Sequence, residues 1–275
     1  MAIGPGAFGF ADFRFPFNSP DGETGAGPFV YDIYDDEMTE LDFDLQLSIV
    51  DEGTGTGNTS GGNAFDATSG DRVGGSFRIR LDDAPVHDPY VIFNLQFLDG
   101  TTGTPVAIND LNIQFFDVDS NPGNDFADVV GYGSGLNPNA ILADNTSLVR
   151  IPPGGTENGF PAFVNTGASD PINTGFTTFR LPEADFESAD NFANDDFANQ
   201  QTVTTSLFFD EFPAVGGDFI FGITGSSTIA KPGRNFFVNM SDPPYVSTVI
   251  PEPAVVGGGF GLAALLMARR RRLSH

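Results

Sequence analysis

Residues 41–50 read LDFDLQLSIV, a strict alternation of apolar and polar side chains. The apolar members are Leu41, Phe43, Leu45, Leu47 and Ile49, and the polar members that separate them are Asp42, Asp44, Gln46 and Ser48. A period of two is typical of an extended chain with one buried and one hydrated face. The stretch therefore predicts a strand of an antiparallel sheet.

Shorter apolar or alternating runs recur along the chain and are separated by loops rich in Gly, Pro, Asn and Asp. They lie at residues 76–81, 90–98, 111–116, 126–132, 148–151, 176–181, 203–209, 219–224 and 235–240. No long amphipathic helical pattern precedes the C-terminal tail. This spacing predicts an all-β fold, a single antiparallel β-sandwich, jelly-roll-like, over residues 1–247. A second small domain starting near residue 155, after the turn-rich stretch 152–171, stays open.

The charge of the chain is strongly acidic before the tail. The 275 residues contain 12 Lys and Arg and 37 Asp and Glu. The tail holds four of the basic residues and one acidic residue, so residues 1–250 carry 8 − 36 = −28. Such a body repels nucleic acid and anionic lipid, which we exclude as its partners, and attracts cations.

The composition also bounds the chemistry of the fold. No Cys is present, so disulfides, thiolate chemistry and Cys-based zinc sites are excluded. The chain has 29 Phe and no Trp. Because Phe has no polar group, we expect it mostly in the core. Sugar-binding faces favour Trp and Tyr, so this composition disfavours a lectin.

The segment 117–128 reads DVDSNPGNDFAD and places oxygen-bearing side chains at the spacing of a calcium loop. The predicted Ca²⁺ ligands are Asp117, Asp119, Asn121, Asp125 and Asp128. The segment resembles the DxDxDGxxDxxD loops of dockerins and thrombospondin-type repeats. It departs from them at Asn121, which replaces an Asp, and at Pro122, which takes the place of the turn Gly. The alternative is an ordinary acidic hairpin loop, rich in Asp and Asn for turn propensity.

Residues that could support catalysis are scarce. His87 and His275 are the only histidines, and no GxSxG, HExxH or phosphate-binding loop occurs. A glycosidase that works through two carboxylates stays open, but nothing in the sequence marks a pair. We therefore expect a protein that is not an enzyme.

The C-terminal tail, residues 248–275, has three parts in a fixed order. Pro251-Glu252-Pro253 is followed by the uncharged run AVVGGGFGLAALLMA at residues 254–268, and then by Arg269, Arg270, Arg271 and Arg272. An Arg cluster after an apolar segment favours the cytoplasmic side of a membrane. Fifteen helical residues reach about 22 Å, less than the roughly 30 Å of a bilayer core. We therefore expect a short, loosely helical transmembrane segment, weakened by Gly257, Gly258 and Gly259, because a permanent anchor is usually longer and has fewer glycines.

This tail resembles the PEP-CTERM sorting signal of bacterial exopolysaccharide-associated proteins. In that family a membrane-embedded exosortase recognises and processes the tail. The resemblance implies export, membrane association through the tail before processing, and delivery to the cell surface or extracellular matrix. A plain membrane anchor is the alternative. MAIGPGAFGF at residues 1–10 is not a signal peptide, so export predicts a leader encoded upstream of Met1.

Together these features predict an exported structural or interaction protein, stabilised by calcium, in the extracellular polysaccharide layer. There the acidic surface and a divalent cation would bridge anionic partners. The alternative is a calcium-dependent carbohydrate-binding module.

Overall fold

The structure is a computed structural model of the 275-residue chain. It describes residues 27–34, 40–52, 65–67, 77–81, 90–116, 118–120, 126–156, 175–182, 201–225, 234–240 and 247–250. The fold of this part of the chain is all-β, and its main strands pair antiparallel. The expected sorting helix over residues 254–268 lies outside the described residues.

One sheet has eight strands. In order across the sheet these are β1 (Phe29–Tyr34), β2 (Glu40–Glu52), β5 (Tyr90–Asp99), β13 (Gly217–Gly225), β8 (Phe126–Gly133), β11 (Phe176–Arg180) and β10 (Val149–Ile151). The short strand β6 (Pro105–Val106) also pairs with β5.

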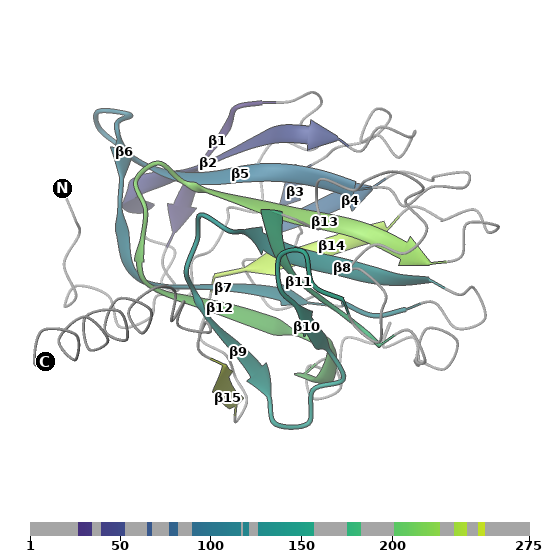
Figure 1. Ribbon diagram of the computed structural model, residues 1–275. Coiled ribbons are helices and arrows are strands. Elements are labelled where there is room, and N and C mark those ends of the chain that lie inside the picture. The colour runs from purple at the N-terminus through teal and green to yellow at the C-terminus, as the bar shows by residue number, and fades with distance from the viewer. Residues whose placement is uncertain are drawn as a thin grey trace, which may run out of the picture.

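The second sheet has seven strands. Their order is β15 (Ser247–Ile250), β9 (Asn139–Ala143), β12 (Thr205–Phe212), β7 (Ile108–Phe116), β14 (Arg234–Asn239), β4 (Phe77–Leu81) and β3 (Phe65–Ala67). Figure 1 shows β1, β2 and β5 at the top of the molecule and β12, β9 and β15 at the bottom.

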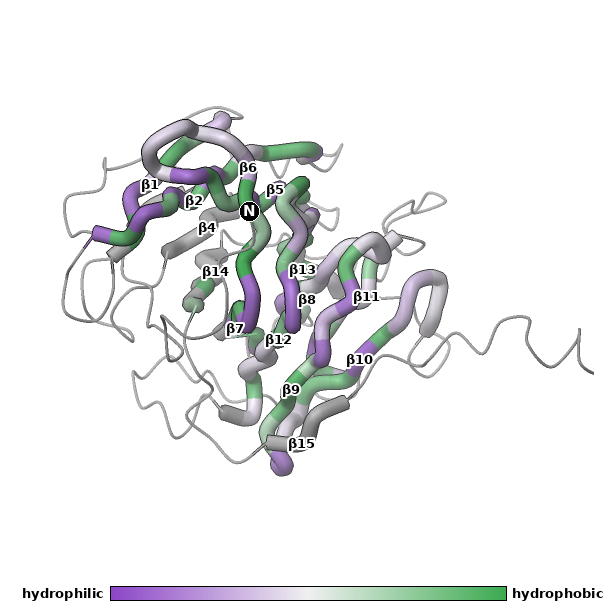
Figure 2. Tube along the Cα trace, turned by 90° about the vertical axis from the view of Figure 1, so that its left-hand side faces the viewer, coloured by the Kyte–Doolittle hydropathy of each residue, from purple (hydrophilic) through white to green (hydrophobic). Residues whose placement is uncertain are grey.

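Strand β2 follows the alternation of its sequence. Leu41, Phe43, Leu45 and Leu47 are buried, whereas Asp42 is exposed and Asp44 is half-buried. The same residues are in register with β5, where Leu45 lies opposite Phe97 and Leu47 opposite Leu95. Figure 2 shows hydrophilic and hydrophobic segments alternating along β1 and β2. The predicted strand is confirmed, and it extends to residues 40–52.

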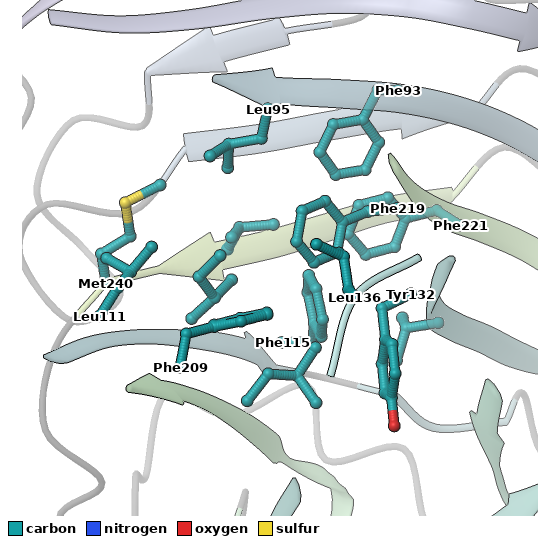
Figure 3. Packing of buried hydrophobic residues seen from close by; sticks show 14 of the residues in the cluster. Phe93, Leu95, Leu111, Phe115, Tyr132, Leu136, Phe209, Phe219, Phe221 and Met240 are labelled. Carbon is teal, nitrogen blue, oxygen red and sulfur yellow. The ribbon is translucent and has the colours of Figure 1, made fainter. Parts of the chain in front are cut away.

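The two sheets share one hydrophobic core. Phe219 of β13 packs against Phe115 of β7 with ring centroids 5.8 Å apart, and against Phe212 of β12 at 6.4 Å. Within its own sheet Phe219 stacks on Phe93 of β5 at 5.6 Å. All four rings are fully buried. Figure 3 shows Phe93, Phe219 and Phe115 converging from three strands. The expectation that Phe supplies the core is confirmed for these residues.

Consecutive strands cross repeatedly between the two sheets. From β4 to β10 the chain visits the seven-stranded and eight-stranded sheets in turn, with only β6 remaining in the sheet of β5. The crossing from β7 to β8 contains the segment predicted to bind calcium. This connection places the ends of two long strands, one from each layer, next to the candidate ligands.

Candidate metal centre and acidic face

The β7–β8 connection is described for part of the predicted calcium segment. Val118, Asp119 and Ser120 follow β7, and Asp128 lies in β8. The other three predicted ligands, Asp117, Asn121 and Asp125, lie outside the described residues.

Asp119 and Asp128 lie directly opposite each other. The backbone N–H of Asp128 donates to the carbonyl oxygen of Asp119 at 2.8 Å, and Ser120 bridges to Ala127 in the antiparallel sense. Residues opposite each other in an antiparallel pair project to the same side, with Cβ atoms about 4.5–5.5 Å apart. Two of the five predicted ligands are therefore neighbours on one side of the hairpin.

Both aspartates are buried in an apolar environment. Asp119 is 1% exposed and Asp128 is 0% exposed. Asp128 is in register with Ile223 of β13, and Val118, next to Asp119, donates its N–H to the carbonyl oxygen of Val203 at 3.0 Å. Each aspartate also interacts with other residues of the chain. A low-dielectric setting strengthens both the repulsion between two carboxylates and the attraction of each to a cation.

The chemistry of this pair fits Ca²⁺, which binds carboxylate oxygens and takes six to eight oxygen ligands. Within the described ranges no group of three or more His, Cys, Asp or Glu residues is close enough to hold a metal. Two aspartates are an incomplete set, and a full site needs ligands from the rest of the segment. The calcium site stays a prediction, with Asp119 and Asp128 as its buried half.

A second feature is the acidic face, which we define as a set of nine outward side chains on β1, β2, β5 and β13. The same strands also carry the apolar residues Val50, which is exposed, and Ile92 and Ile220, which pack together outside the inter-sheet core. The members of the acidic face alternate with core residues and are Val30, Asp32, Asp42, Asp44, Gln46, Ser48, Asn94, Gln96 and Asp218. Asp32 of β1 lies opposite Asp44 of β2. Like charges placed opposite each other destabilise a strand pair.

The pKa of Asp44 reflects its partial burial first and the nearby negative charges second. Partial burial raises the pKa of the Asp44 carboxyl above its ordinary value, and the negative charges of Asp32, Glu40 and Asp99 raise it further. The pKa of Asp99 is instead lowered, first by the backbone N–H of Thr102 and then by its hydroxyl, which donate to Asp99 Oδ1 at 2.7 and 2.9 Å. The ionised form is therefore disfavoured at Asp44, by burial and nearby negative charges, and favoured at Asp99, by hydrogen bonds from the turn.

We expect Asp44→Asn to be more stable than the wild type at pH 7. A carboxyl whose folded pKa is raised contributes stability below its unfolded pKa, and that contribution is lost as the pH rises through the folded value. The variant should therefore gain about 0.5 kcal/mol at neutral pH. The gain should fall as the pH is lowered and vanish at about pH 2, well below the ordinary aspartate pKa, where Asp44 is protonated in both states. Urea unfolding at the two pH values measures it.

Asp210→Asn, an exposed aspartate of β12, is the matched control and should show no such difference. An Asp44→Asn variant less stable than the wild type at pH 7 would show that the Asp44 charge is stabilising, against the repulsion inferred here.

The structure does not describe the other sequence candidates. The sorting residues Pro251, Glu252, Pro253 and Arg269 to Arg272 lie outside the described residues, as does His87. Strand β15 ends at Ile250, immediately before Pro251. The acidic face was missed by the sequence reasoning, although the polar positions of residues 41–50 were its visible signal.

Comparison with known proteins assigns no family to the chain. No family model matches the chain, and no curated protein matches it. In the part of the chain that the structure describes, no helix has the length and apolar character needed to cross a membrane.

Proposed function

We propose that the chain is an exported protein of the cell surface or exopolysaccharide matrix, with a structural or interaction role and no catalysis. The observation that carries this proposal is the order of the three parts of the tail: Pro251-Glu252-Pro253, the apolar run 254–268 and the Arg cluster 269–272. An exosortase would recognise and process this tail, and the membrane would hold the chain only until then.

We infer that residues 1–247 form one jelly-roll-like sandwich and that residues 254–268 form the sorting helix. Support for the sandwich comes from the strands that cross between two sheets and from the core that both sheets share. Because β15 pairs with β9 up to Ile250, the processed tripeptide would follow directly on a strand of the body.

The proposed role of Ca²⁺ is to join the two layers. The ligands Asp117, Asp119, Asn121, Asp125 and Asp128 begin where β7 of one sheet ends and extend into β8 of the other. An ion bound there would neutralise the buried Asp119–Asp128 pair and cross-link both sheets. In a chain without disulfides, such an ion replaces a covalent cross-link as a stabilising element.

Changing Pro251, Glu252 and Pro253 together to alanine tests the delivery step. We expect a longer, unprocessed form to accumulate in the membrane fraction of the producing cells, because the processing enzyme would lose its recognition element. Immunoblots of membrane, surface and medium fractions measure this. Pro152→Ala with Pro153→Ala, two exposed prolines after β10, is the matched control and should leave processing unchanged. Normal processing of the tail variant would contradict recognition of the tripeptide.

A further inference from the structure

Strand β15 occupies an edge of the seven-stranded sheet. Among the described strands it pairs only with β9, over the four residues Ser247–Ile250. Figure 1 shows the two strands side by side at the bottom of the molecule. Pro251 has no backbone N–H, so the ladder cannot continue into the tripeptide. Strand β15 can therefore leave the sheet without separating any other described strand pair, and terminal segments of a fold open at the lowest free-energy cost.

The chain has to span its own sheet to reach β15. Strand β14 is four positions away in the order β15-β9-β12-β7-β14, which is about 19 Å at the usual strand spacing. The registers place Asn239, the last residue of β14, and Val249 of β15 in one row across the sheet. From Asn239 to Ser247 there are 247 − 239 = 8 residue steps, which span at most about 28 Å. Docking of β15 thus uses most of the available length and costs conformational entropy, which release of the strand restores.

Release of β15 changes how far the tail can extend from the body. With β15 docked, the apolar run starts at Ala254, four residues beyond Ile250, and so lies within about 14 Å of the sheet edge. The acidic body, with 8 − 36 = −28 over residues 1–250, then lies close to an anionic membrane surface that repels it. With β15 released, the last fixed residue is Met240, which is 2% exposed in the shared core (Figure 3). From Met240 to Ala254 the chain spans up to about 50 Å, so release relieves the repulsion.

We propose that β15 controls the access of the exosortase to the tail. This inference rests on the proposed processing of the tail and adds how that step is regulated. While β15 is paired with β9, the tripeptide is held next to the sheet edge, where the body blocks a membrane-embedded enzyme. When β15 leaves, Pro251-Glu252-Pro253 reaches the enzyme on a long connection. After processing, β15 pairs with β9 again and covers the backbone groups at the edge of that strand.

Hydrogen exchange of the purified full-length chain measures the release of β15 without any enzyme. We expect the backbone amides of residues 247–250 to exchange at least about a hundredfold faster than those of β12, a central strand of the same sheet. The reason is that β15 opens locally, whereas β12 opens only with the sheet. Equal protection of the two strands would overturn the proposal.

A disulfide between β15 and β9 tests the control of processing in the producing cells. Val249→Cys with Ile141→Cys joins residues that lie opposite each other in register, and a chain without Cys forms no competing disulfide. Ile250→Cys with Ala140→Cys offers the other antiparallel pair geometry. The outer side of the membrane is oxidising. We expect the processing rate to fall by at least about tenfold and to recover with a reductant, because the cross-linked strand has no released fraction.

Two further variants are the controls, and immunoblots of the membrane fraction over time measure all of them. Asp32→Cys with Asp44→Cys cross-links β1, an edge strand of the other sheet, to β2. Val249→Cys alone changes the side chain without a cross-link. Both should be processed as the wild type is. Processing of the β15–β9 cross-linked chain at the wild-type rate would overturn the proposal, whereas a wild-type chain that is never processed would overturn the proposed function itself.

Discussion

Phe219→Ala is expected to lower the free energy of unfolding by about 3–5 kcal/mol, the cost typical of removing a buried ring. Phe219 is 0% exposed and contacts Phe93, Phe115 and Phe212, two of which belong to the opposite sheet. The substitution would leave a cavity where the two layers meet. We expect the melting temperature to fall by about 10 °C, from the usual scaling for chains of this size.

Two other substitutions serve as controls for the effect of Phe219→Ala on stability. Phe219→Leu keeps much of the volume and should cost less than about 1.5 kcal/mol. Val215→Ala, at a residue that is 79% exposed, should change stability by less than about 0.5 kcal/mol. A Phe219→Ala variant as stable as Val215→Ala would contradict a core shared by the two sheets.

Calcium is expected to raise the melting temperature of the wild type by about 5–10 °C. An ion at 100 times its dissociation constant stabilises the folded state by about 2.7 kcal/mol, which corresponds to that shift in a chain of this size. Asp128→Asn should abolish most of the rise, because it removes one of the two buried carboxylates that face each other.

Thermal melts with calcium and with chelator measure this difference, and Asp210→Asn serves as the surface control. An equal calcium shift in Asp128→Asn and in the wild type would place the ion elsewhere. The absence of any shift in the wild type would remove calcium from the account.

Strands with one solvent-exposed face gave a clear pattern in the sequence, and strands buried on both faces gave a weaker one. Residues 41–50 alternate because β2 has core on one side and solvent on the other. Strand β8 is a weaker pattern for a physical reason: Phe126 to Tyr132 are all buried, so no period of two marks it. The sequence reasoning missed five short strands that lie beside Gly- or Pro-rich stretches, namely β1, β3, β6, β9 and β15.

The candidate sites also differ in how far the sequence alone could predict them. The Asp117–Asp128 spacing is local, so the sequence could propose the pair Asp119 and Asp128 before the hairpin register placed them opposite each other. The acidic face depends on the strand order β1-β2-β5-β13, which joins residues more than 100 positions apart, such as Asn94 and Asp218. Pairing of that kind leaves no periodic signal in the chain.

Delivery by the tail is tested most directly by the mass of the protein recovered from the outside of the producing cells. The account predicts a C-terminus upstream of the Arg cluster, with no peptide from residues 269–275 in the surface or matrix fraction. Recovery of the chain only from the cytosol, intact to His275, would contradict it.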